Sequence, residues 1–121
     1  MLLRTGIDLL EIHRMKSAQQ RFGNHFLERI FTLAEIADVG DNTASLAARF
    51  AAKEAVAKAL GTGIGIISWH EIEILRSPTR EPILYLHGVA LRLAQEIGVT
   101  TWSLSLSHSQ SHAIAVVVAI G

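Results

Sequence analysis

The sequence predicts one α+β domain over residues 1–121, with an antiparallel sheet, a long central helix and shorter helices. Three observations predict it. Apolar residues follow strand-like patterns near both ends of the chain, and they recur every three to four residues between about 12 and 60. The resulting order is a strand, several helices and then mostly strands. A length of 121 residues, 50% of them hydrophobic, is enough for one ordinary core.

The first strand is expected from the apolar residues 2–3 and 7–10, which flank Thr5 and Gly6. A glycine inside a strand marks either a β-bulge or a close approach of another backbone. Both alternatives stay open for Gly6.

Helices are expected next. The spacing of apolar residues from 12 to 22 is typical of an amphipathic helix, which Gly23 should end, and a short helix follows. Thr32 and Glu35 have the spacing of a capping box, which predicts a further helix that ends near Gly40. The central helix is expected from about 45 to 60, with Gly61 as its left-handed cap.

The second half of the chain is expected to be mostly strands with one helix. The predicted strands are 69–75, 83–86, 101–107 and 113–120, the predicted helix is 88–97, and the predicted turn is 77–82.

Composition excludes several classes of function. Eleven basic and eleven acidic side chains give zero net charge, so a sequence-independent nucleic-acid binder is not expected. The chain has no cysteine, which excludes disulfides and thiolate zinc sites. The longest apolar run, 113–120, is too short to span a membrane, and the first residues do not resemble a signal peptide. We therefore expect a soluble cytoplasmic protein.

The central helix carries four charges, Arg49, Lys53, Glu54 and Lys58, on a surface that is apolar nearly all round. Such a helix is usually buried, and buried charges are unfavourable unless they are paired or bind ligands. One interpretation is structural: Glu54 and Lys58 form an i, i+4 ion pair and the other two cations reach solvent. The alternative is that the helix binds a metal ion and a polyphosphate.

Asp8 favours the second interpretation, because it interrupts an otherwise apolar strand. Magnesium binds oxygen ligands, usually one or two carboxylates together with phosphates and water. Asp8 and Glu54 are therefore candidate magnesium ligands.

Two motifs then resemble the holo-acyl-carrier-protein synthase family of phosphopantetheinyl transferases. The first is Gly6-Ile7-Asp8 followed by Glu11 and Arg14, and the second is the run from Arg49 to Gly63. The resemblance extends over nearly the whole chain, including residues 105–109. It implies a 4′-phosphopantetheinyl transferase-like fold and a small trimeric enzyme with active sites at subunit interfaces.

The resemblance also implies a reaction. Enzymes of this family use Mg²⁺ to transfer the 4′-phosphopantetheine arm of coenzyme A to a serine of apo acyl carrier protein. They release adenosine 3′,5′-bisphosphate and support fatty acid biosynthesis. Asp8, Glu54 and Lys58 match the catalytic positions, with Asp8 and Glu54 as metal ligands. The base for the serine hydroxyl stays open between Glu54 and a metal-bound water.

Coenzyme A binding is implied for two groups of residues. The resemblance assigns side chains and a glycine-rich turn to this substrate: Arg49, Lys53, Lys58, Gly61, Thr62, Gly63 and His108. Each part also has a simpler interpretation. The turn follows a helix, so it is no dinucleotide-binding fingerprint and is equally a helix cap, and His108 is on the apolar face of a strand, where a core histidine is common.

Arg14 and Arg21 are expected to dock the acidic carrier protein, although a cationic helix is often only a solvated surface. Two other functions stay open at this stage. One is a metal-dependent phosphohydrolase that acts on a nucleotide, and the other is a non-catalytic trimeric binding module.

Overall fold

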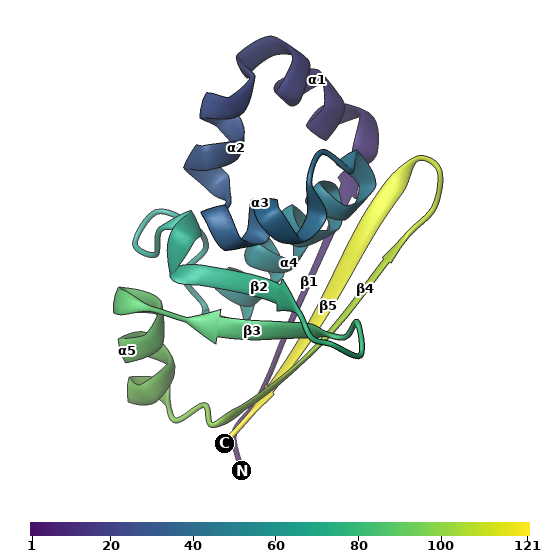
Figure 1. Ribbon diagram of the computed structural model, residues 1–121. Helices are drawn as coiled ribbons and strands as arrows, with labels where there is room; N and C mark the ends of the chain where they lie inside the picture. The colour runs from purple at the N-terminus through teal and green to yellow at the C-terminus, as the bar shows by residue number, and fades with distance from the viewer.

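The computed structural model describes residues 1–121 and confirms the α+β class (Figure 1). The elements in chain order are β1 (Leu3–Glu11), α1 (Ile12–Phe22), α2 (Asn24–Ile30), α3 (Leu33–Val39), α4 (Thr43–Leu60), the short 3₁₀ helix η1 (Trp69–Glu71), β2 (Ile72–Arg76), β3 (Pro82–Leu86), α5 (Gly88–Ile97), β4 (Thr101–His108) and β5 (His112–Ile120).

Two antiparallel sheets enclose α4. The larger has the strand order β1-β5-β4, and β2 pairs with β3 in the smaller one. Small side chains of β5 alternate toward α4, among them the buried Ala115 and Val117, and Ile72 and Ile74 of β2 belong to the same core. The alanines of α4 allow this close packing on two sides, so the helix is the centre of the molecule (Figure 1).

The Gly6 position is a close approach and not a bulge. The pairing of β1 with β5 is continuous from Leu3 opposite Ile120 to Glu11 opposite His112. A Cβ atom at Gly6 would overlap the carbonyl oxygen of Ala55 in α4. Glycine is therefore required here because it lets β1 lie directly against the helix.

The predicted helix ends are confirmed at several positions. The Thr32 hydroxyl accepts the Glu35 N–H at 3.1 Å, and the Thr32 N–H donates to the Glu35 carboxylate at 2.9 Å, which completes the capping box. Gly61 ends α4 in the left-handed conformation, with φ of 82°. The start of α4 is Thr43, slightly earlier than expected, because the Asn42 side chain accepts the Ser45 N–H and caps the first turn.

The strand expected over 69–75 begins later than predicted. Trp69–Glu71 form a 3₁₀ turn, and β2 begins at Ile72. The Glu71 carboxylate accepts the Ser68 N–H at 2.8 Å and closes this turn. This local cap overrides the β-propensity of the segment.

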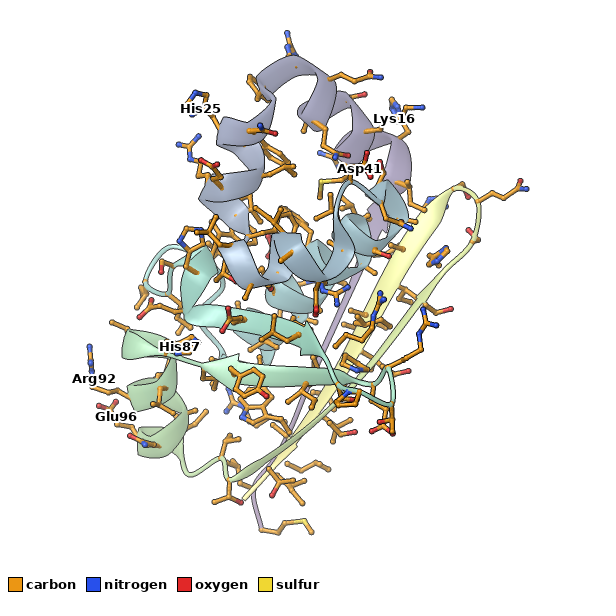
Figure 2. All side chains as sticks on the ribbon, viewed as in Figure 1. Lys16, His25, Asp41, His87, Arg92 and Glu96 are labelled. Carbon is orange, nitrogen blue, oxygen red and sulfur yellow. The ribbon has the colours of Figure 1, made fainter.

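Polar and charged side chains project outward from the smaller helices. Lys16 of α1, His25 of α2, and Arg92 and Glu96 of α5 are exposed and extend away from the body of the molecule (Figure 2). None of the helices combines the length and the apolar character that crossing a membrane requires.

One apolar surface is left uncovered. It is the face of the larger sheet opposite α4, called here the open sheet face. Its apolar side chains are each at least 37% exposed: Leu3, Ile7, Leu9, Ile114, Val116, Val118 and Ile120.

Candidate active site

Asp8 and Glu54 line one cleft of about 470 Å³ between β1, α1 and α4. Its other walls are apolar residues and one cation: Leu9, Leu10, Arg14, Met15, Phe26 and Phe50. The contact of Gly6 with Ala55 brings β1 against α4, so two carboxylates that are far apart in sequence meet at this cleft.

Lys58 connects the same two elements. Its Nζ lies 3.0 Å from Asp8 Oδ1 and donates to the Ile7 carbonyl oxygen at 2.9 Å. The Lys58 side chain is 52% exposed. The ion pair between Glu54 and Lys58, one of the two interpretations of the helix, does not form, because Lys58 pairs with Asp8 instead.

The side-chain carboxylate of Glu54 forms no hydrogen bond and no ion pair with another residue. Burial raises the pKa of Glu54, the charge of Asp8 raises it further, and Lys58 opposes both effects. Asp8 is therefore paired with Lys58, whereas the Glu54 carboxylate in the same cleft has no cation within ion-pair distance.

This donor set fits a divalent cation. Asp8 and Glu54 offer the hard oxygen ligands that magnesium prefers, and a cation between them would favour the charged form of Glu54 against the burial and the Asp8 charge that raise its pKa. No third acidic or histidine side chain joins the pair. Water and substrate phosphates would supply the other ligands, as is usual for magnesium.

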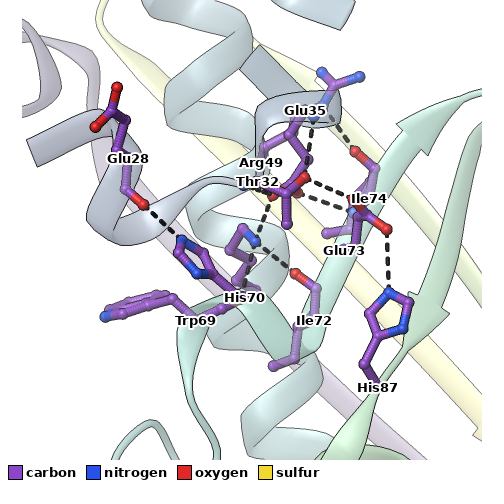
Figure 3. Close-up of polar contacts among 11 residues, drawn as sticks. Glu28, Thr32, Glu35, Arg49, Trp69, His70, Ile72, Glu73, Ile74 and His87 are labelled. Atoms are coloured by element: carbon purple, nitrogen blue, oxygen red, sulfur yellow. Dashed lines mark hydrogen bonds and ion pairs between the residues drawn. The ribbon is translucent and has the colours of Figure 1, made fainter. Parts of the chain in front are cut away.

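Lys53, expected to help bind coenzyme A, is wholly buried beside Glu35, whose contacts with Thr32 and Ile74 are drawn in Figure 3. Its Nζ lies 2.7 Å from Glu35 Oε1 and donates to the carbonyl oxygens of Ile72 at 2.5 Å and Trp69 at 3.0 Å. Burial lowers the pKa of Lys53, and the neighbouring Glu35 carboxylate opposes this shift. All three ammonium protons are used within the protein, so the expectation of a ligand contact is wrong.

Glu35 is the residue that sequence reasoning missed in this network. Besides Lys53, its carboxylate accepts the N–H groups of Thr32 and of Ile74, the latter at 2.9 Å. The capping box predicted only the contacts of Glu35 with Thr32. The contact of Glu35 with Lys53 joins residues 18 apart, and no local sequence pattern predicts it.

Arg49 and His108 line a second cavity, of about 300 Å³, called here the arginine pocket. The remaining lining residues are Ser45, Ala48, Arg76, Arg80, Pro82, Leu104, Ser105, Leu106 and Ser107. No acidic side chain lines this cavity. Sequence reasoning missed Arg76 and Arg80, which the β2–β3 hairpin brings beside α4 and β4.

The guanidinium of Arg49 is held in place at this cavity. Its Nε donates to the Ile74 carbonyl oxygen at 3.2 Å, and one Nη lies 3.6 Å from the Asp38 carboxylate. Burial lowers the pKa of Arg49, Arg76 lowers it further, and Asp38 opposes these effects.

The turn Gly61-Thr62-Gly63 lines neither cavity. The N–H groups of Thr62 and Gly63 both donate to the Ala57 carbonyl oxygen, at 3.2 and 3.3 Å. These amides close the end of α4, which favours the helix-cap interpretation of the turn.

Arg14 and Arg21 are both exposed on α1 and line a shallow groove with His13, Ser17, Ala18 and Phe22. Arg14 also borders the cleft of Asp8 and Glu54. The cationic face of α1 is therefore continuous with the carboxylate site.

Comparison with known proteins identifies the family. Residues 4–117 match the 4′-phosphopantetheinyl transferase superfamily. A holo-[acyl-carrier-protein] synthase of Herpetosiphon aurantiacus is 48% identical over 127 residues, which span 99% of this chain and 100% of the relative. The synthase of the same description from Dehalococcoides mccartyi is 51% identical over 118 residues, 98% of each chain.

A solved structure agrees in fold. The crystal structure of Helicobacter pylori holo-[acyl-carrier-protein] synthase in complex with coenzyme A superposes with a TM-score of 0.88 and 38% identity, over 96% of this chain and 99% of that chain. The agreement covers the whole domain, including the strands and the helix that form the carboxylate cleft. The chain thus belongs to the 4′-phosphopantetheinyl transferase superfamily and is a phosphopantetheinyl transferase.

Proposed function

We propose that this enzyme transfers the 4′-phosphopantetheine arm of coenzyme A to a serine of apo acyl carrier protein, in a Mg²⁺-dependent reaction that releases adenosine 3′,5′-bisphosphate. The observation that carries the proposal is the open cleft in which the unpaired Glu54 carboxylate lies with Asp8, whose own carboxylate pairs with Lys58. The relatives' descriptions as holo-[acyl-carrier-protein] synthases support the same substrate pair.

Asp8 and Glu54 are the proposed magnesium ligands. When bound, the metal would supply Lewis-acid stabilisation of charge on the pyrophosphate. The unpaired state of Glu54 supports this assignment, because a bound cation would neutralise a carboxylate that forms no ion pair within the protein.

In the proposed reaction the serine oxygen forms a bond to the phosphorus next to the pantetheine arm, and the bond from that phosphorus to the adenosine bisphosphate breaks. Glu54 lines the cleft without a hydrogen-bonding partner, so its carboxylate is available to take the serine proton. Lys58 donates to Ile7 and Asp8 and has one further proton to offer, so its half-exposed ammonium group can stabilise the leaving phosphate.

Arg49 and His108 are proposed to bind phosphate groups of the coenzyme A nucleotide. A cavity lined by arginines, a histidine and serines, without a carboxylate, supports an anionic ligand. Arg14 and Arg21 are proposed to dock the carrier protein, and the overlap of their surface with the carboxylate cleft supports this role.

We also propose that the chain forms a homotrimer with active sites at the subunit interfaces. The open sheet face supports self-association, since a contiguous apolar surface of this kind commonly marks an interface. Light scattering should give three times the mass of one chain, and Val116→Lys, which places a charge on this face, should dissociate the assembly. A monomeric wild type would contradict the proposal.

The reaction requires a compartment that contains coenzyme A and a carrier protein, and we propose the cytoplasm. Fatty acid synthesis is the proposed pathway, with a fatty-acid carrier as the preferred partner.

The decisive test is to incubate the protein with coenzyme A, Mg²⁺ and apo acyl carrier protein and to weigh the carrier by mass spectrometry. The expected result is a mass gain of one phosphopantetheine arm, which is lost in Asp8→Ala and in Glu54→Ala. Glu96→Ala, which removes an exposed carboxylate from α5, is the matched control and should behave as wild type. Release of adenosine bisphosphate without a mass gain would instead indicate a hydrolase.

A further inference from the structure

Arg80 has an unusual backbone conformation. It is the only residue other than glycine with a positive φ, at 73°. It lies in the turn between β2 and β3, where its N–H donates to the Ser77 carbonyl oxygen at 2.8 Å and the Ser77 N–H donates to the Glu81 carbonyl oxygen at 2.9 Å. The hydrogen bonds of this turn fix Arg80 in the left-handed region.

Glycine is the residue that such a turn position normally favours, since a Cβ atom makes the left-handed region unfavourable. A non-glycine residue held there lowers stability, and such residues are found most often where function requires them. The hydrogen bonds of the turn are made by the backbone of Arg80, so a glycine would preserve them. The reason for arginine must lie with its side chain.

The side chain of Arg80 lines the arginine pocket together with Arg49, Arg76 and His108. Arg49 has an acidic neighbour, Asp38 at 3.6 Å, but Arg76 and Arg80 form no ion pair and their guanidinium groups make no hydrogen bond. Two uncompensated cations therefore face one cavity. Ser45 of α4 also lines this cavity.

This combination fits a compact dianion. A phosphate monoester carries close to two negative charges at neutral pH, and guanidinium groups bind its oxygens in pairs. A phosphodiester group, or a phosphate within a pyrophosphate, carries less charge than a phosphate monoester and offers fewer unesterified oxygens. The cavity thus favours a terminal phosphate over a bridging one.

We propose that Arg80 is a specificity-determining residue, which the turn holds in an unfavourable backbone conformation so that its charge selects ligands bearing a phosphate monoester. The inference rests on the proposed function, in which this cavity binds the nucleotide of coenzyme A. Coenzyme A has one phosphate monoester, on its ribose, and 3′-dephospho-coenzyme A differs from it by that group alone.

The test compares the binding of these two ligands by calorimetry, which requires neither a carrier protein nor turnover. Arg80→Gly should weaken coenzyme A binding by about tenfold, a typical loss for a charged hydrogen bond, and leave 3′-dephospho-coenzyme A within about twofold. The same variant should raise Tm by about 2–6 °C, because glycine relieves the backbone conformation. Arg92→Ala on α5, an exposed arginine distant from the cavity, should change neither affinity.

Each other outcome has a distinct meaning. Equal weakening of both ligands, or no weakening of either, would overturn the specificity assigned to Arg80 while the proposed function stands. A lower Tm in Arg80→Gly would overturn the part of the inference that concerns the backbone. A wild-type protein that binds neither ligand would contradict the proposed function itself, and this inference with it.

Discussion

Lys53 and Lys58 lie on the same helix and each contacts a carboxylate, but their surroundings differ completely. Lys53 is wholly buried and all of its protons are bound, to Glu35 and to two carbonyl oxygens. Lys58 is half exposed, and the carboxylate that it contacts, Asp8, shares its cleft with Glu54, which has no partner. Lys53 therefore has no unused proton for a ligand, whereas the cleft near Lys58 contains a carboxylate, Glu54, that is free to bind one.

A charged residue on a buried helix therefore indicates function only when hydrogen bonds and ion pairs within the protein do not already use its charged group. Mutations on the two sides of α4 should therefore separate stability from catalysis.

The largest effect is expected for Lys53→Ala. Removing one partner leaves the Glu35 carboxylate buried without its cation, which should lower the free energy of unfolding by about 3–5 kcal/mol. Denaturant unfolding followed by circular dichroism measures this loss. Replacing both partners, Lys53→Met with Glu35→Leu, should recover most of the stability, and a full loss in the double variant would show that the pair itself is required.

Lys58→Ala should have the opposite profile. Loss of the ammonium group that faces the leaving phosphate should reduce the transfer rate by on the order of 10²-fold or more. Because the side chain is half exposed, the unfolding midpoint should hardly change. A variant that is strongly destabilised, or that keeps full activity, would remove the distinction between the two lysines.

Gly6→Ala should lower both the stability and the activity of the protein. The added methyl group would overlap the Ala55 carbonyl oxygen and push β1 away from α4, at a cost of about 1–3 kcal/mol in stability. Since Asp8 lies on β1 and Glu54 on α4, activity should fall as well, even at temperatures where the variant is folded. Gln95→Ala, at an exposed position of α5, is the control and should retain both properties.

The raised pKa of Glu54 predicts how the metal-free protein responds to pH. A group whose pKa is higher in the folded protein stabilises the fold below its unfolded pKa, and this contribution is lost as pH rises through the folded pKa. Glu54→Gln should therefore reduce the loss of unfolding free energy as pH rises from the unfolded pKa of Glu54 to its folded pKa. Titrating unfolding midpoints of both proteins without divalent cations checks this, and identical profiles would contradict it.

The smallest effect is expected on the docking surface. Arg14→Glu should raise the KM for the carrier protein by about fivefold, as expected for an exposed charge, with little change in the KM for coenzyme A. Lys16→Glu makes the same charge change on the same helix, but Lys16 does not line the carboxylate cleft, and its effect should be weaker. Equal losses for both substrates in Arg14→Glu would argue against docking.

Sequence reasoning predicted the elements whose signals are local. The capping box of Thr32 and Glu35 and the left-handed cap at Gly61 are confirmed, because each depends on residues within one turn. The start of β2 was placed too early, since the turn at Trp69 depends on a side-chain contact of Glu71 rather than on propensity.

The parts of the site that sequence reasoning missed depend on contacts between distant residues. Lys53 and Lys58 both lie among the alanines of α4, and only the position of α3 shows that Glu35 satisfies Lys53. Arg76 and Arg80 carry no motif, and only the folding of the β2–β3 hairpin beside His108 reveals them as part of a cavity. Asp8 and Glu54, which do line one cleft, were expected to act together because Asp8 interrupts an apolar strand and because the family resemblance pairs the two positions.

The pairing of β1 with β5 has a consequence for the order of events during synthesis. Asp8 lies opposite Ala115, more than one hundred residues later in the chain, and β5 is the only strand that pairs with β1. Contacts of such long sequence separation close late and slowly. A nascent chain that still lacks β5 should therefore form α4 and its neighbouring helices while Asp8 is not yet fixed in place. Catalytic competence should appear only after β5 leaves the ribosome.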